Sequence, residues 1–277
     1  MAAPSKAQLL DTVYNLLRKR YKLEPKPERL SVMESIIYGI CHEGTTREQA
    51  NQAVGRFKDG FFDWNEVRVS PMTQVRETLA DLPDPDVKSQ RLRRFLRQMF
   101  SKTYGFNLDA LVKGPQKDAV KALRVYEATA SDYVLATAIQ HGLGGHAIPI
   151  DRPLRRALER LGLIEANIDD ATARAALERA IPKNRGAEFV DLMEELSHDT
   201  CVEGEPECPR CELKKVCPTG QVRLAKPAAK DKATAEPGKA AAAPAPARKA
   251  APEKKTAPAP APAPAPARAA KPTGPRK

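Results

Sequence analysis

Apolar residues recur every three or four positions through about the first 200 residues, which is the spacing of one buried face on a helix. The first stripe comprises Leu9, Leu10, Val13, Leu16 and Leu17, and the second comprises Met33, Ile36, Ile37 and Ile40. Capping-box pairs precede three of the stripes: Ser5 with Gln8, Ser31 with Glu34, and Thr45 with Glu48. The pattern therefore predicts helices with defined starting residues.

Similar stripes continue toward the C-terminal end of this region. They predict helices at about 71–82, 87–100, 116–126, 131–141, 152–161, 169–180 and 184–198. Pro71 and Pro153 stand where a helix begins, and Gly142 and Gly162 stand where one ends. No segment alternates convincingly over strand length, and hairpin turn pairs are absent, so the sequence predicts an all-α body.

Four of the five cysteines fall within seventeen residues, at Cys201, Cys208, Cys211 and Cys217. Thiolates this close can bind one compact centre, either a tetrahedral zinc ion or a [4Fe-4S] cluster. The single C-x2-C pair with two outlying cysteines favours iron–sulfur and leaves zinc as the alternative. Such a cluster of thiols suits a reducing compartment. Cys41 stands alone on an apolar face and is expected to be buried and inert.

Three segments carry a resemblance to a known family. The cysteine loop, "IPIDRPLRRALERLGL" at 148–163 and "PKNRGAEFVDLMEELSHDTC" at 182–201 resemble endonuclease III and the adenine glycosylases, which are helix–hairpin–helix DNA repair enzymes with a C-terminal [4Fe-4S] loop. The resemblance covers roughly 28–218 and is strongest from 148 onward. It implies an N-terminal helix in 1–27, a two-lobed helical body over 28–199 with the hairpin at about 116–151, and an iron–sulfur loop at 200–218.

Asp151 precedes Pro153 and is either an ordinary helix cap or a catalytic group. Hydrolysis of the bond between base and sugar builds positive charge on the sugar, so it requires a carboxylate that stabilises this charge and orients water. The resemblance implies that Asp151 is that carboxylate, acting on a flipped, damaged or mismatched base in double-stranded DNA. The alternatives are a non-catalytic relative that binds lesions or duplex DNA, and an unrelated zinc-bearing helical module.

In the family that this chain resembles, the members that also cut the DNA strand carry a lysine at the position that Asp132 or Tyr133 occupies here. Without that amine no imine with the opened sugar forms, so we expect a glycosylase without lyase activity. Residues 126–131 also lack the glycines of the family hairpin, which leaves Ser131 and the amides after it as a weaker anion site. Gly144 and Gly145 form either a flexible approach to the cleft or a plain interhelical turn.

Charge near the cysteines departs from the family pattern. The insert Val-Glu-Gly-Glu-Pro-Glu at 202–207 is acidic where relatives are basic. Arg210, Lys214 and Lys215 either supply the contact with the DNA backbone or are ordinary exposed charges. In the loop 41–45, His42 or Glu43 either fills the gap left by the flipped base or belongs to a solvated turn.

The composition changes at about residue 222. Residues 221–277 hold 13 Lys and Arg against 3 Asp and Glu, which accounts for +10 of the formal net charge of +11. They also hold 12 of the 25 prolines and no aromatic residue, so the segment 222–277 is expected to be disordered. It either contacts DNA non-specifically or serves as a solubilising appendage. The N-terminus shows no signal peptide and no stretch resembles a membrane span, so we expect a cytoplasmic, nucleoid-associated monomer.

Overall fold

The computed structural model describes residues 5–23 and 29–225. It divides the chain into two units, Met1–Ala228 and Ala229–Lys277, and the second unit lies outside the described residues. The predicted disordered tail also lies outside them, except for residues 222–225. Every regular element in the described part is helical, which confirms the predicted all-α class. None of the described helices has the length and apolar character needed to span a bilayer.

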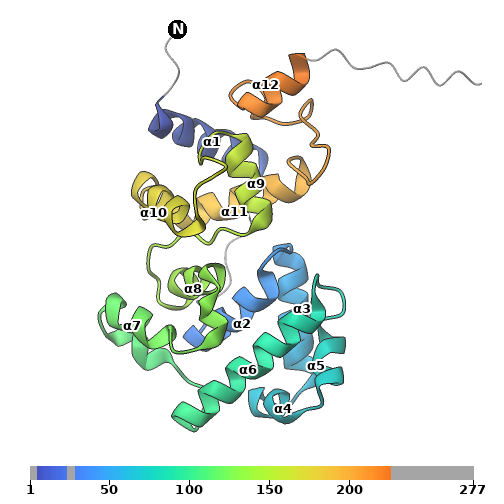
Figure 1. Cartoon of the computed structure of the whole chain (residues 1–277), viewed down its shortest axis with the longest axis vertical. Helices are drawn as coiled ribbons and strands as arrows, with labels where there is room; N and C mark the ends of the chain where they lie inside the picture. The colour runs from blue at the N-terminus through green and yellow to red at the C-terminus, as the bar shows by residue number, and fades with distance from the viewer. Residues whose placement is uncertain (1–4, 24–28, 226–277) are drawn as a thin grey trace, which may run out of the picture. The chain divides into compact units, whose positions relative to one another are not determined.

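One lobe of the first unit is built from consecutive elements (Figure 1). These are α2 (Val32–His42), α3 (Arg47–Gly60), α4 (Trp64–Val69), α5 (Met72–Thr78), α6 (Pro85–Thr103), the 3₁₀ turn η1 (Asp109–Lys113), α7 (Gln116–Leu123), the 3₁₀ turn η2 (Glu127–Ala130), α8 (Asp132–Thr137) and the π-helical turn η3 (Ala138–Gly142). We call it the α2 lobe because ten of the eleven residues of α2 are buried in it.

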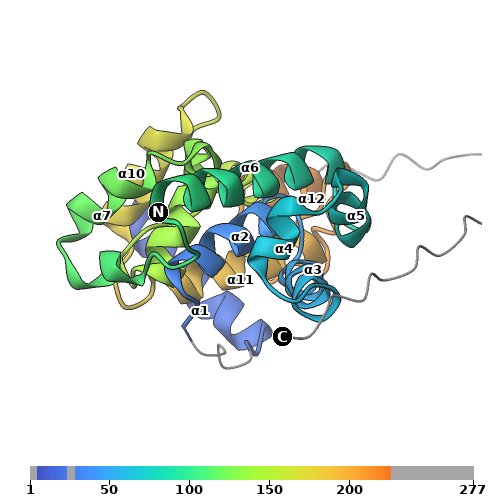
Figure 2. The same cartoon turned by 90° about the horizontal axis from the view of Figure 1, so that it is seen from below.

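Packing around α2 explains why these elements assemble. Helix α6 lies against it and contributes the apolar face predicted from the sequence, with Phe95 fully buried (Figure 2). Helix α8 lies against it at Gly39, where an added Cβ would stand 3.3 Å from Thr137 and Val134. A glycine at that position therefore allows the close approach of the two helices.

The second lobe combines both ends of the described chain (Figure 1). It contains α1 (Lys6–Arg20), α9 (Arg152–Arg160), α10 (Asp170–Ala180), α11 (Gly186–Asp199), the cysteine loop and α12 (Pro218–Ala225). We call it the α9 lobe. Leu17 of α1 packs in one core with Leu158 of α9 and Phe189 of α11. The predicted two-lobed architecture is thus confirmed, and the N-terminal helix is part of the second lobe.

Capping chemistry sets several helix starts as predicted. Ser5 with Gln8 and Ser31 with Glu34 form complete capping boxes. The third box was predicted one residue too early, because Thr46 pairs with Gln49 while the neighbouring Thr45 is buried. The predicted hairpin region contains α7, η2 and α8. Its second helix was predicted over 131–141, whereas α8 ends at Thr137 and the chain continues as the π-helical turn η3.

Candidate active site

Asp151 lies at the start of α9, where the local sequence makes it a helix cap. Its Oδ1 accepts a hydrogen bond from the Leu154 backbone N–H at 2.9 Å. Pro153, which has no N–H to satisfy, suits the first turn of that helix. The backbone of the α9 lobe thereby fixes the direction of the carboxylate.

The other carboxylate oxygen contacts the α2 lobe. Oδ2 of Asp151 accepts a hydrogen bond from the Gly44 backbone N–H at 3.1 Å. Gly44 follows the C-terminus of α2 with a φ of +76°, a conformation that other residues adopt only with strain. Because each oxygen receives one backbone donor, each keeps acceptor capacity for a further partner.

A cavity of about 650 Å³ opens beside this carboxylate between the two lobes. Its charged lining, besides Asp151, comprises Glu43, Asp84, Lys88, Arg91, Arg152, Arg155, Arg156, Asp170 and Glu203. The volume falls in the range of small-molecule sites in proteins, roughly 300–1,000 Å³. The cavity is therefore large enough to receive a group the size of a nucleobase.

Burial raises the pKa of Asp151 above its ordinary value. The backbone donors Leu154 and Gly44 and the charge of His42 oppose this rise, whereas the carboxylate of Glu194 adds to it. A carboxylate with a raised pKa is a stronger proton acceptor, so the environment suits a general base.

A buried polar network lies behind the carboxylate. His42 contacts Glu194 Oε1 through Nε2 at 2.6 Å and the Tyr133 hydroxyl through Nδ1 at 2.9 Å. The Arg47 backbone N–H also donates to Glu194 Oε1, at 3.0 Å. These contacts join α2, α8 and α11, so they help fix the two lobes together.

This network corrects the prediction made for His42 and shows where Tyr133 lies. His42 is only 7% exposed and is held on both ring nitrogens, so it does not project from the loop as a wedge. Tyr133, one of the two positions expected for a lyase lysine, is buried, and burial raises its pKa well above the ordinary value. Glu194 is one of several acidic residues on α11, so the sequence gives no signal that singles it out as the partner of His42.

Ser131 lies in a smaller cavity of about 330 Å³ between α6 and η2. It caps α8 by accepting from the Val134 N–H at 3.4 Å, and its hydroxyl donates to Glu43 Oε1 at 2.8 Å. Arg91 forms an ion pair with the same glutamate. The residue predicted as an anion site is thus hydrogen-bonded to a carboxylate in this structure.

Gly144 and Gly145 lie in the segment between η3 and α9. The guanidinium of Arg29 stands 3.1 Å from the position of a Cβ at Gly144, which has a φ of +66°. The side chain of Gln116 stands 2.7 Å from the corresponding position at Gly145. Both glycines lie outside the lining of the Asp151 cavity, and their packing fits the interhelical-turn alternative.

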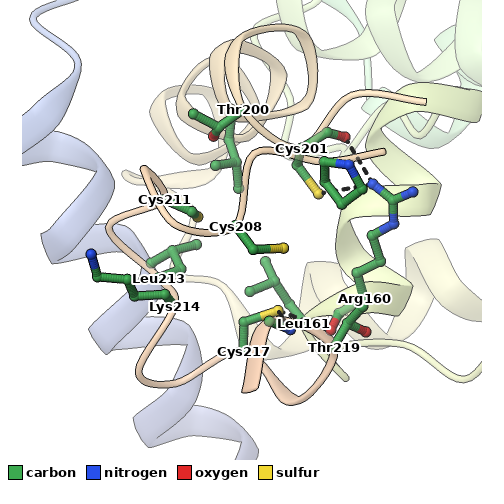
Figure 3. Close-up of a pocket in the computed structure, with 13 residues that line it drawn as sticks. Arg160, Leu161, Thr200, Cys201, Cys208, Cys211, Leu213, Lys214, Cys217 and Thr219 are labelled. Carbon is green, nitrogen blue, oxygen red and sulfur yellow. Dashed lines mark hydrogen bonds between the residues drawn. The ribbon is translucent and has the colours of Figure 1, made fainter. Parts of the chain in front are cut away.

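Cys201, Cys208, Cys211 and Cys217 line one pocket, and none of them forms a disulfide (Figure 3). Leu213 supplies part of its apolar wall. Burial raises the pKa of Cys211 and of Cys217, and nearby cysteines raise both further. Burial in this pocket therefore disfavours the thiolate form of these two cysteines, and a positive charge among the four sulfurs would favour it.

The spacing of the donors bears on which metal centre fits. In residues 5–23 and 29–225, no three His, Cys, Asp or Glu side chains are placed to hold a single metal ion. A tetrahedral zinc site needs every sulfur about 2.3 Å from one point. An iron–sulfur cluster bonds each sulfur to a different iron, so it accepts a wider quartet.

Arginines of α9 tie the cysteine loop to the helix that Asp151 caps. Arg160 Nη1 donates to the carbonyl of Val202 at 2.7 Å and approaches Cys201 Sγ at 3.5 Å. Arg156 donates to the carbonyl of Cys201 at 3.2 Å. The Gly220 N–H donates to Cys217 Sγ at 3.3 Å, so α12, which the sequence analysis missed, also supports the loop.

Each glutamate of the acidic insert lies within ion-pair distance of an arginine, and all of these side chains are exposed. Glu203 lies 3.8 Å from Arg152, Glu205 lies 3.8 Å from Arg223, and Glu207 pairs with Arg210. Of the remaining predicted contacts, Lys214 donates to the carbonyl of Pro209 at 2.8 Å and Lys215 is exposed. All three of the predicted basic residues lie outside the Asp151 cavity.

No family model and no curated protein matches the sequence. Solved structures do match the fold. A non-covalent endonuclease III–DNA complex aligns with a TM-score of 0.65 at 16% identity, covering 80% of this chain and 100% of that one. A trapped covalent endonuclease III–DNA intermediate gives 0.64 at 16% identity, covering 79% and 98%, and a thermostable thymine-DNA glycosylase gives 0.59 at 15%, covering 78% and 97%. The described chain therefore adopts the helical fold of endonuclease III and related DNA glycosylases.

Proposed function

We propose that this chain is a DNA glycosylase that hydrolyses the N-glycosidic bond of a base extruded from duplex DNA. One observation carries the proposal: within an endonuclease III fold, the Asp151 carboxylate faces an interlobe cavity with a backbone donor on each oxygen. The same fold is seen in structures of endonuclease III bound to DNA. Extruding a base costs a few kcal/mol and is easiest for damaged or mismatched bases, so we infer such a base as the substrate.

In this proposal Asp151 acts in two ways. As the glycosidic bond breaks, its negative charge stabilises the positive charge that develops on the sugar. Its remaining acceptor positions orient a water molecule, and the raised pKa favours transfer of the water proton to the carboxylate.

We further propose that the chain lacks lyase chemistry through an imine. Tyr133 and Asp132 supply no amine at the expected position. Lys88 lines the cavity, but its ammonium group donates to the carbonyls of Ile40, Cys41 and Glu43. A lysine nucleophile must be neutral and free to attack, so these contacts argue against Lys88 in that role.

We propose that the four clustered cysteines hold a [4Fe-4S] cluster. The convergence of the four thiols on one pocket supports it, as do the Arg160 and Gly220 donors directed at the sulfurs. The cluster would join the parts of the cysteine loop to one another, while Arg156 and Arg160 hold the loop against α9, and we assign the cluster no step in base removal. The zinc alternative predicts colourless protein with one zinc, whereas this proposal predicts iron, labile sulfide and visible absorbance.

A non-catalytic DNA-binding protein is the second candidate. The observation that favours it is the hairpin, where the Ser131 hydroxyl donates to Glu43 and where residues 126–131 contain no glycine. Such a hairpin is a weaker phosphate site than a glycine-rich one.

Release of free base from defined oligonucleotides tests the proposal. The duplexes carry uracil, an oxidised pyrimidine, mismatched adenine, mismatched thymine or an alkylated purine, and Asp151→Asn is compared with the wild type. Base release that depends on Asp151, with strand breaks only after alkali, is the expected result. DNA binding without release from any duplex supports the second candidate. Release that Asp151→Asn leaves intact refutes the assigned role of the carboxylate.

A further inference from the structure

Lys88 is a buried charged residue. It lies on α6 and is only 6% exposed. Lys88 and Arg91 are the two basic side chains of α6 that contact the end of α2 and the loop after it. Its Nζ donates three hydrogen bonds: to the carbonyl of Ile40 at 2.9 Å, of Cys41 at 3.0 Å and of Glu43 at 2.6 Å. All three protons of the ammonium group are thereby used.

The three carbonyls belong to the C-terminal end of α2. A helix leaves its last carbonyls without partners inside the helix, and its C-terminus carries partial negative charge. A buried ammonium group at this end satisfies both conditions. Burial lowers the pKa of Lys88, while its carbonyl acceptors favour the charged form. A helix cap alone would account for these contacts.

The peptide group between Glu43 and Gly44 goes beyond a cap. Its carbonyl oxygen accepts from Lys88 Nζ at 2.6 Å, and its N–H donates to Asp151 Oδ2 at 3.1 Å. A peptide group is planar, so fixing the oxygen also fixes the direction of the N–H. A cation on the oxygen also polarises the amide and strengthens its N–H as a donor.

We propose that Lys88 is a positioning residue for Asp151, acting through the Glu43–Gly44 peptide group that it holds. This inference rests on the proposed glycosylase function for its catalytic meaning. The contact itself does not depend on that function. In this arrangement Lys88 orients the carboxylate and favours its ionised form through the peptide group.

Other charged groups around Asp151 set the background for this effect. His42 from α2, Tyr133 from α8, and Glu194 and His198 from α11 interact with it electrostatically. The rest of the charged cavity lining comprises Glu43 of the loop after α2, Asp84 before α6, Arg91 of α6, Arg152, Arg155 and Arg156 of α9, Asp170 of α10, and Glu203 of the cysteine loop. A substitution at Lys88 leaves all of these in place.

The experiment measures the pKa of Asp151 directly in the full-length protein. Carboxyl-¹³C-labelled aspartate is titrated by NMR, and Asp151→Asn identifies the resonance. Lys88→Met and Lys88→Gln remove the charge, Lys88→Arg keeps it, and Lys121→Met neutralises an exposed lysine on α7 as the matched control. Both neutral variants should raise the pKa of Asp151 by about one unit, whereas the arginine and control variants should leave it unchanged.

A purely structural lysine would lower the midpoint of thermal unfolding but leave the pKa of Asp151 where it is. That result, in a neutral variant that keeps the wild-type amide spectrum, overturns the proposal. If neither neutral variant folds, the test uses the wild-type protein. The chemical shift of the Gly44 amide proton should then change with pH in parallel with the titration of Asp151. A Gly44 chemical shift that does not follow this titration also overturns the proposal. Where base release is detected, the acid limb of its pH profile should move with the measured pKa. An absence of base release from every duplex refutes the proposed function and leaves the NMR result standing.

Discussion

Asp151→Asn removes one negative charge while keeping the shape of the side chain. Asparagine is as good a helix cap as aspartate, so its Oδ1 can still accept from the Leu154 N–H. The asparagine amide has a single acceptor oxygen, so it cannot offer one oxygen to the Leu154 N–H and another to the Gly44 N–H. The substitution therefore tests the charge of the carboxylate with little disturbance of α9.

The expected loss of activity follows from the charge interaction. A carboxylate about 4 Å from the developing positive charge, at an effective dielectric constant of about 20, contributes about 4 kcal/mol. Each 1.4 kcal/mol or so corresponds to a factor of ten in rate. We therefore expect base release to fall about a thousandfold, with DNA affinity nearly unchanged.

The expected change in stability is much smaller, because two effects oppose each other. The raised pKa means that the folded state binds a proton more tightly than the unfolded state, so ionised Asp151 disfavours folding above its folded-state pKa. Asparagine relieves that cost at neutral pH, but losing the Gly44 acceptor costs about 1 kcal/mol. The free energy of unfolding at pH 7 should change by no more than about 1 kcal/mol. Compared with the wild type, the variant should become relatively less stable as the pH falls through the folded-state pKa of Asp151 toward the ordinary aspartate value, and the difference should stay constant below that value.

Single-turnover base release and urea denaturation between about pH 4 and pH 8 measure the two quantities. A variant that retains activity within tenfold of the wild type refutes the role assigned to the charge. If the variant loses 3 kcal/mol or more of its free energy of unfolding at pH 7, Asp151 serves mainly to cap α9 and to hold the two lobes together.

Four further outcomes are expected. Cys208→Ser should lose iron and labile sulfide, whereas Cys41→Ala, which alters the isolated buried thiol, should retain both; equal metal content in the two variants contradicts the cysteine assignment. Borohydride added during turnover should trap no protein–DNA adduct, and a trapped adduct would require a lysine nucleophile. Phe95→Ala should lower the free energy of unfolding by about 3–5 kcal/mol in urea denaturation, because this ring of α6 is fully buried in the core of the α2 lobe. Truncation after residue 225 should weaken non-specific DNA binding and flatten its salt dependence, and an unchanged slope would exclude the tail from binding.

Local signals in the sequence were sufficient for most helices. The boxes at Ser5 and Ser31 begin helices because their side-chain hydrogen bonds involve residues only three positions apart. α4 and α12 were missed for an opposite reason. Each is too short to display a periodic apolar face, with Val67 and Gly220 as their respective buried residues. Contacts with the rest of the fold decide such helices.

Only part of the candidate site could be predicted from the sequence, for the same reason. Asp151 and the four cysteines stand in motifs with fixed spacing, so a single sequence can indicate them. Gly44 lies 107 positions from the carboxylate it contacts, and Glu194 lies 152 positions from His42. No local pattern reports such pairings, and only the packing of the two lobes brings them together.

The position of α1 in the α9 lobe has a consequence for synthesis of the chain. The α2 lobe is continuous in sequence, so it can fold as soon as it leaves the ribosome. Helix α1 is made first, yet its apolar partners on α9 and α11 are made more than about 130 residues later. At about 5–20 residues per second, its apolar face stays uncovered for at least several seconds in every nascent molecule. Among the described helices, α1 therefore has an apolar face that stays exposed until α9 and α11 have been made.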